Sequence, residues 1–279
     1  MANETGDEKQ TSQSTSAGAA TSDGPRSRFR EFTEGGGSFI FAILLALVIR
    51  WGLIEAYVIP SASMLPSLLI HDHIFVNKLV YGVRVPFTEK WLWQFKQPAR
   101  GEVVVFKYPE NKETFFIKRI VGLPGDRILY ENGRLYINDQ AVEMTQPGDQ
   151  DDWEMLSPPN FGNEDFQNPL YATDSKNNYD HFAEKLGDKS HSVLLRKDGG
   201  YGRSAGPWVV PDGHLFVMGD NRDNSHDSRR WQSSPFLPME NILGRAMFVW
   251  LSCDRTMESA KFLCSPSSIR WRRLFHSVN

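Results

Sequence analysis

Cysteine is scarce in this chain. Only Cys253 and Cys264 are present, and no histidine or cysteine pair at zinc-finger spacing accompanies them, so no metal site is predicted. Excess positive charge is also lacking, because the net charge is −3, and this excludes nucleic acid as an expected partner. No internal repeat with a period of about 20 to 50 residues occurs, which excludes a solenoid or a propeller.

Aromatic residues are absent from Met1 to Ser27, a region rich in Ser, Thr, Gly, Ala, Asp and Glu. Such a composition buries too little apolar surface to offset the entropy of ordering. We therefore predict a disordered tail over residues 1–34.

An unbroken apolar run from Phe39 to Ile49 follows this tail. By itself the run is shorter than the roughly 20 residues that span a bilayer. Extended over residues 35–58 it reaches that length, provided that Arg50 snorkels to the interface. We predict a single transmembrane helix over this range. Three arginines precede it, which places the tail in the cytoplasm and the remainder of the chain outside: Arg26, Arg28 and Arg30.

Two other interpretations of the run stay open. A cleaved signal peptide also has arginines, an apolar run and small residues, although the stretch before this run is long and Ser61-Ala62-Ser63 lies far beyond it. A buried core helix is the second, disfavoured because the run is apolar on every face. The compartment of the domain also determines the oxidation state of its two cysteines. Cys253 and Cys264 could form a disulfide in an exported domain, whereas two free thiols are expected in the cytoplasm.

Beyond Pro60 the pattern changes to strands bounded by turn residues, and the pair Asn132-Gly133 suits a tight hairpin. We predict strands at 74–80, 102–108, 114–121, 127–130, 135–137, 214–218 and 245–251. Together they predict a β-core over residues 59–140 and 207–251. Residues 141–206 are rich in Asn, Asp, Pro, Gly and Ser with one strand at 192–196, so we predict an inserted smaller lobe there, and a C-terminal extension over 252–279.

Three clusters of polar residues lie where apolar residues are expected. Pro60 to Pro66 presents Ser61 and Ser63 on a backbone restricted by two prolines, although a serine in such a place is usually a simple loop residue. In Thr114 to Val121, strand alternation places Lys118 on one face with Phe116 and Ile120. If that face is covered, desolvation lowers the lysine pKa and makes the amine a competent base; if it is open, the lysine is merely solvated.

The third cluster, Gly219 to Arg230, is dense in short polar side chains and suits a loop held by side-chain to backbone hydrogen bonds. Its Asp and Arg residues could equally form a solvated surface loop. A calcium loop of the EF-hand type is not supported, because the required Gly and Glu positions are not filled.

Three motifs in this order behind a membrane helix resemble the bacterial type I signal peptidases. They are Ser-x-Ser-Met-x-Pro, Lys-Arg-x-x-Gly-Leu-Pro-Gly-Asp and Gly-Asp-Asn-Arg-Asp-Asn-Ser-x-Asp-Ser-Arg. The resemblance runs from about residue 50 to residue 251. It implies a mainly β fold, an antiparallel β-domain with an inserted smaller β-lobe, anchored by N-terminal helices, of which this sequence supports one. The Cys253 and Cys264 pair is not part of the family motifs.

The resemblance also implies roles for individual residues. Ser63 resembles the nucleophile, Lys118 the general base, and Ser61 with the backbone N–H of Ser63 the oxyanion hole; Ser225 would hydrogen-bond and aim the amine of Lys118. Ion pairs would hold the site, and shallow pockets would take small substrate side chains. The ion pairs would be Asp227 with Arg229 and Asp220 with Arg119. The pockets would be lined by Ile59, Val105 and Ile117.

The resemblance implies that the chain is a membrane-anchored serine endopeptidase, which removes signal peptides from exported preproteins. It would lie in a bacterial inner membrane, with the catalytic domain on the external side. No metal or organic cofactor is expected. Two rivals remain: a serine and histidine signal peptidase using His71 or His73, and a non-catalytic β-module that binds signal peptides at the membrane. A self-cleaving repressor-type peptidase is disfavoured, because it would need a DNA-binding motif and no membrane helix.

Overall fold

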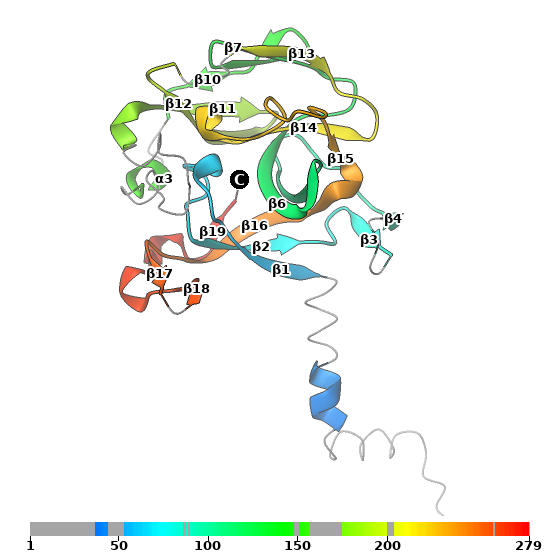
Figure 1. The fold of residues 1–279 in the computed structure, drawn as a ribbon, viewed down its shortest axis with the longest axis vertical. Helices are drawn as coiled ribbons and strands as arrows, with labels where there is room; N and C mark the ends of the chain where they lie inside the picture. The colour runs from blue at the N-terminus through cyan, green and yellow to red at the C-terminus, as the bar shows by residue number, and fades with distance from the viewer. Residues whose placement is uncertain are drawn as a thin grey trace, which may run out of the picture. The chain divides into compact units, whose positions relative to one another are not determined.

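The computed structural model describes residues 37–43, 53–85, 88, 90–147, 151–156, 175–199, 204–258 and 260–278 (Figure 1). The chain divides into two units, residues 1–47 and residues 48–279. In the first unit the described residues, 37–43, are helical. The predicted tail over 1–34 lies outside the described residues, as do 35, 36 and 44–52 of the predicted transmembrane helix. Within the described ranges, no helix has both the length and the apolar character needed to cross a membrane.

The second unit is built around an antiparallel sheet with the strand order β1-β2-β16-β5-β6-β14-β15, and β19 pairs with β16. The prediction of a mainly antiparallel β-fold is confirmed. Its strands are β1 (Ile54–Val58), β2 (Asp72–Asn77), β5 (Val103–Tyr108), β6 (Asn111–Gly122), β14 (His214–Met218), β15 (Leu237–Pro238), β16 (Ile242–Ser252) and β19 (His276–Ser277).

Smaller sheets accompany the main one. The sheets are β10 (Met144–Thr145) with β11 (Tyr179–Leu186) and β12 (Lys189–Arg196); β13 (Ala205–Val209) with β7 (Arg127–Glu131), β8 (Arg134–Ile137) and β9 (Gln140–Ala141); β3 (Gly82–Arg84) with β4 (Trp91–Gln94); and β17 (Thr256–Met257) with β18 (Ala260–Cys264). Short helices complete the described fold: α3 (Asp151–Glu154), η1 (Ala62–Met64), η4 (Lys176–Asn178), η5 (Arg222–Asn224), η6 (Met239–Asn241), η7 (Pro266–Ser268) and η8 (Trp271–Arg273).

The predicted strands correspond to β2, β5, β6, β7, β8, β14, β16 and, for residues 192–196, β12. The hairpin at Asn132-Gly133 is also confirmed, since Glu131 pairs with Arg134 and both turn residues have positive φ, 50° and 80°.

One prediction is wrong at its C-terminal end. Ile54–Val58, expected as the last turns of the transmembrane helix, form strand β1, which pairs with β2 from Ile54↔Asn77 to Val58↔His73. The β-branched and aromatic residues of this stretch suit a strand, and β2 supplies partners for its backbone groups.

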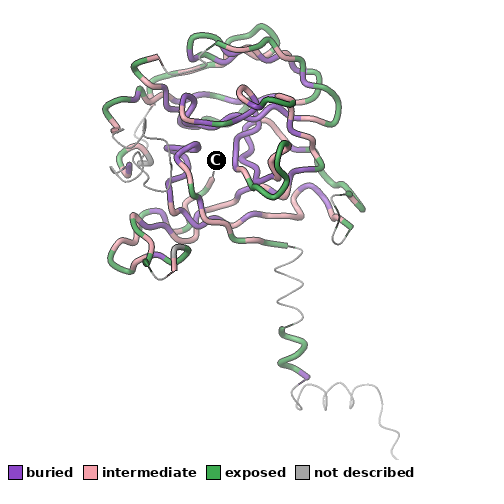
Figure 2. Tube along the Cα trace, in the orientation of Figure 1, coloured by how far each residue is buried: buried purple, intermediate pink, exposed green. Residues whose placement is uncertain are grey.

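Apolar clusters cover both faces of the main sheet, and Figure 2 shows the buried residues along its inner strands. One cluster gathers Ile59, Met64, Ile74, Val105 and Ile117 with other residues. A second contains Val104, Phe106, Ile120 and Val217, with Phe116 packed against it. Because successive side chains of β6 point to opposite faces, Ile117 enters the first cluster, whereas Phe116, Lys118 and Ile120 point to the other side.

Cys253 and Cys264 form a disulfide, the outcome expected for an exported domain. It joins the end of β16 to the end of β18 and so closes the β17–β18 hairpin. The C-terminal extension is tied to the main sheet as well, because β19 pairs with β16 and the buried Arg273 donates to both carboxylate oxygens of Asp72.

Candidate active site

Ser63 lies in the single turn η1 between Pro60 and Pro66, with 7% of its surface exposed. The backbone around it is held by Asn221, whose N–H donates to the carbonyl oxygen of Ser63 and whose side-chain amide donates to that of Ala62, both at 3.1 Å. The short turn therefore has a fixed position against the loop after β14.

Lys118 comes to the same place from β6, where it pairs with Val104 of the neighbouring β5. It is 4% exposed, and its Nζ donates to Ser63 Oγ at 2.7 Å and to the carbonyl oxygen of Ile117 at 2.9 Å. The Phe116 ring covers one side of the amine, with its centroid 5.3 Å from Nζ. The face of β6 that carries Lys118 is therefore covered, which settles the question that the sequence left open.

Burial lowers the pKa of Lys118 to about 8. The carboxylates of Asp227 and Asp220 act in the opposite direction, and Arg229 lowers the pKa further. Desolvation has the largest effect, because the ammonium loses more free energy of hydration on burial than it gains from its attraction to these partly neutralised carboxylates. Near neutral pH a substantial fraction of the amine is therefore neutral and can accept a proton from the hydroxyl 2.7 Å away.

The loop after β14 is held by an ion pair between Asp227 and Arg229. Arg229 donates from Nε and Nη2 to the two carboxylate oxygens at 2.9 and 2.8 Å, and the N–H of Gly219 donates to Asp227 at 2.9 Å. Gly219 is required here because a Cβ at this position would lie 2.5 Å from the carbonyl oxygen of Ser63 and 2.2 Å from Ser225 Oγ. The backbone of the loop thus packs directly against the nucleophile candidate.

Arg119, next to Lys118 in β6, forms the second predicted ion pair. Its Nε and Nη2 donate to the two carboxylate oxygens of Asp220 at 2.8 and 2.7 Å, and both side chains are about 1% exposed. Burial alone would raise the pKa of Asp220, but Arg119 outweighs it and holds this pKa below its usual value. A bidentate pair of this kind fixes β6 to the loop.

Ser225, which is predicted to hydrogen-bond and aim the amine of Lys118, is buried in the loop after β14. Its Oγ is packed against Gly219, and Ser225 helps to lower the pKa of Asp227. The hydrogen bonds of Lys118 Nζ go to Ser63 and to its own strand, and the orienting role of Ser225 stays a prediction.

Ser61 does reach the site, since its Oγ lies 3.3 Å from Ser63 Oγ. The three residues expected to line substrate pockets, Ile59, Val105 and Ile117, lie together in one apolar cluster that also holds Met64, the residue after Ser63. They are 2%, 3% and 8% exposed, so only their outermost atoms are open to a ligand.

His73, one of the two histidines that closely follow Ser63, has its ring in contact with other parts of the chain. His73 is part of β2, and its Nε2 lies 2.7 Å from the carbonyl oxygen of Phe262 in β18. Its Nδ1 lies 3.1 Å from the carbonyl oxygen of His71. Neither of these two contacts of the His73 ring involves Ser63, whose Oγ is hydrogen-bonded by Lys118.

Two residues of the site were missed by the sequence analysis. Ser67 donates to Asp220 at 2.5 Å, and Asn221 holds the turn that carries Ser63. The only sequence signal was their place inside polar stretches beside the motifs, which does not separate a structural contact from a solvated one.

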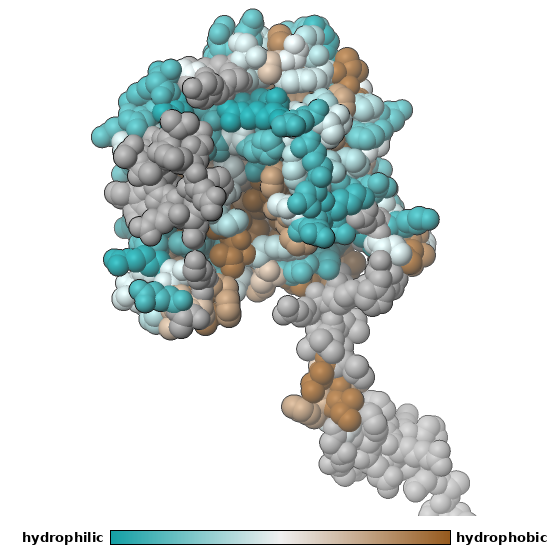
Figure 3. Space-filling model, in the orientation of Figure 1, coloured by the Kyte–Doolittle hydropathy of each residue, from teal (hydrophilic) through white to brown (hydrophobic). Residues whose placement is uncertain are grey.

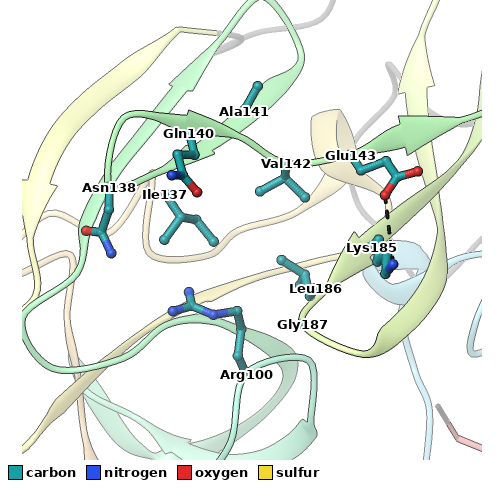
Figure 4. Close-up of a pocket in the computed structure, with 10 residues that line it drawn as sticks. All are labelled: Arg100, Ile137, Asn138, Gln140, Ala141, Val142, Glu143, Lys185, Leu186 and Gly187. Atoms are coloured by element: carbon teal, nitrogen blue, oxygen red, sulfur yellow. Dashed lines mark ion pairs between the residues drawn. The ribbon is translucent and has the colours of Figure 1, made fainter.

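A cavity of about 530 Å³ lies apart from this cluster (Figure 4). Ile137, Val142 and Leu186 form its apolar part, and the Glu143–Lys185 ion pair, 4.0 Å long, stands at its margin. None of its lining residues belongs to the Ser63 and Lys118 cluster.

An antiparallel β-fold that places a serine hydroxyl 2.7 Å from a buried lysine amine is an arrangement that suits a serine hydrolase. The family described as signal peptidase, peptidase S26, matches residues 32–251, and the chain belongs to this family. It is a serine endopeptidase.

Individual relatives agree. A signal peptidase I of Pseudomonas fluorescens is 37% identical, with 78% of this chain and 72% of that protein covered. For the signal peptidase I of Pseudomonas aeruginosa the identity is 38% with the same coverage. The signal peptidase I of Buchnera aphidicola subsp. Acyrthosiphon pisum is 35% identical over 87% of this chain and 81% of its own length.

Proposed function

We propose that this chain is a membrane-anchored endopeptidase that cleaves signal peptides from exported preproteins with Ser63 as nucleophile and Lys118 as general base. The observation that carries the proposal is the 2.7 Å contact between Lys118 Nζ and Ser63 Oγ, with the lysine buried and its pKa lowered to about 8. The substrate class is taken from the relatives named signal peptidase I, which are 37% and 38% identical over 78% of this chain.

The reaction follows from this geometry. Lys118 takes the hydroxyl proton of Ser63, and the oxygen attacks the peptide carbonyl carbon. The ammonium then returns the proton to the leaving amine, and an acyl-enzyme remains on Ser63. Water, deprotonated by the same amine, hydrolyses the ester. Ser61 Oγ and the N–H of Ser63 would donate to the carbonyl oxygen as it becomes negative.

An extended substrate has a place beside the nucleophile. β1 is an edge strand of the main sheet, and β14 pairs with β6 only from Arg119 onward. The Tyr57 and Phe115 rings, from β1 and β6, lie 6.1 Å apart, so these two strand edges approach each other. Figure 3 shows the face hollowed in its middle, with apolar side chains in the hollow. We infer that the signal peptide binds there as an added strand.

Small residues are expected at the first and third substrate positions before the cut, because Ile59, Val105 and Ile117 are nearly buried and leave only shallow depressions. Replacing either substrate residue by Leu should lower kcat/KM by about 100-fold or more, far more than the same change at the position between them. Mass spectrometry of the products of a purified precursor series measures this. Equal losses at all three positions would contradict the proposed binding mode.

Membrane anchoring is the second part of the proposal. The helical residues Phe39, Ile40, Phe41 and Ile43 are 72%, 57%, 59% and 44% exposed, so apolar side chains face outward around this stretch. Such a helix suits a lipid environment, and the arginines before it favour a cytoplasmic N-terminus.

We expect protease added outside sealed spheroplasts to digest the domain after Pro60 and to leave the N-terminal tail intact. Immunoblots with antibodies against the two ends of the chain read this out. A domain that stays protected until detergent is added would overturn the topology.

The proposal as a whole is tested by incubating the purified full chain in detergent with a preprotein and identifying the new N-terminus. Cleavage at the end of the signal peptide supports it. Binding of the preprotein without cleavage would favour the non-catalytic alternative.

A further inference from the structure

A buried histidine lies next to the candidate site and takes no part in the proposed reaction. His191, in β12, is 4% exposed and pairs across the hairpin with Glu184 of β11. Its Nδ1 has no hydrogen-bond partner among the described residues, and its Nε2 lies at the distance limit of a hydrogen bond to Glu184. Because buried polar groups are nearly always paired, such an imidazole calls for an explanation.

The Nε2 atom of His191 faces two carboxylates. It lies 3.5 Å from Glu184 Oε1 and 3.8 Å from Asp220 Oδ1. Each carboxylate is already bound by an arginine: Arg222 donates to Glu184 from both terminal nitrogens, and Arg119 donates to Asp220. A neutral imidazole in this place carries its proton on Nε2, since only an N–H is attracted to two negatively charged oxygens.

The surroundings keep the ring neutral. Burial lowers the pKa of His191, and Arg119 lowers it further against the opposing effect of Glu184 and Asp220. The charged groups that face it are thus two carboxylates and their two arginines, which balance each other. The N–H dipole between Glu184 and Asp220 offsets the repulsion between these carboxylates without adding a charge.

The same hairpin is joined to the nucleophile through the backbone. Leu194, three residues after His191 in β12, donates its N–H to the carbonyl oxygen of Asp220 at 2.9 Å. The next residue, Asn221, donates to the carbonyl oxygen of Ser63. A shift of Asp220 would therefore move both the turn that carries Ser63 and, through Arg119, the strand that carries Lys118.

We propose that His191 is a positioning residue, which holds Asp220 and Glu184 at a fixed separation and thereby fixes Ser63 against Lys118. The β11–β12 hairpin, far from the nucleophile in sequence, becomes part of the catalytic framework. This inference rests on the proposed reaction of Ser63 and Lys118, and His191 itself does not contact the substrate.

Two amide substitutions at His191 distinguish the effect of where the N–H lies from the effect of having a polar side chain at all. In His191→Gln the side-chain nitrogen reaches the place of Nε2, whereas in His191→Asn it reaches only the place of Nδ1. We expect the Gln variant to keep kcat within about threefold, and the Asn variant to lose about 10- to 100-fold in kcat, the size of effect that a misplacement of about 1 Å produces. KM should stay within about twofold for both, because the substrate groove is not altered. His191→Phe, which keeps the ring but has no N–H, should behave like the Asn variant.

Val193→Ala is the matched control, because Val193 is fully buried and lies on the same face of the same strand. It should lower the melting temperature of the chain and leave kcat close to wild type. Equal kcat values for the Gln and Asn variants would overturn the inference, as would kcat losses that follow the melting temperature through all four variants. Ser63→Ala, assayed beside them, tests the reaction itself: if it still turns over, the proposed function fails, whatever His191 does.

Discussion

Ser63→Ala is expected to lower kcat/KM for a preprotein by about 10⁵- to 10⁶-fold, the loss found when the nucleophile of a serine hydrolase is removed. The reason is that no other hydroxyl of the site is placed to replace it: Ser61 Oγ is not bound to Lys118, whose contacts are to Ser63 Oγ at 2.7 Å and to the carbonyl oxygen of Ile117. The fold should be unaffected, since η1 is held through backbone groups by Asn221. Cleavage of a labelled precursor under single-turnover conditions measures the loss.

Ser61→Ala provides the graded control, because it removes the same atom two residues earlier on the same turn. A lost oxyanion-hole donor costs about 10²- to 10³-fold in kcat, so this variant should retain measurable turnover. If the two alanine variants were equally active, Ser63 would not be the nucleophile.

Parts of this site could be predicted from the sequence because they depend on local pattern. The alternation in β6 placed Lys118 with Phe116 and Ile120, and that arrangement is observed. The pairs Arg119–Asp220 and Asp227–Arg229 followed from the motifs and are formed. In each case the deciding residues are neighbours in one strand or belong to a motif of short, defined spacing.

Other parts depend on contacts between distant segments. Whether the Lys118 face is covered depends on the turn η1, which brings Ser63 onto Lys118 from another part of the chain. The place of His191 follows from the register of β11 against β12, which no local pattern fixes.

The error at Ile54–Val58 has a similar cause. The apolar character of the preceding run continues into β1, and composition alone does not separate the end of a helix from an edge strand of apolar residues. The deciding interaction is the pairing with Asp72–Asn77, a segment that follows the nucleophile in the chain.

For the general base, the expected result is a pH profile of kcat/KM that rises through about pH 8 and then levels off, since the working form of Lys118 is the neutral amine and burial lowers its pKa to that value. At its usual pKa of about 10.4, only about one lysine in a thousand would be neutral at pH 7.4. Lys118→Arg should lose nearly all turnover, on the order of 10⁴-fold or more, because a guanidinium does not give up its proton in this range.

Lys118→Met is the matched control, since it keeps the length and packing of the stem and has neither charge nor base. If it is folded and as inactive as the Arg variant, the lost proton acceptor and not a displaced strand explains the loss. The His73 ring is in contact with the carbonyl oxygens of His71 and Phe262, so we expect it not to restore turnover in either variant. Rates of precursor cleavage from pH 5 to 10, with Ser63→Ala as the blank, measure these profiles. A wild-type profile that is flat over this range, or an Arg variant of near-normal rate, would show that Lys118 is not the base.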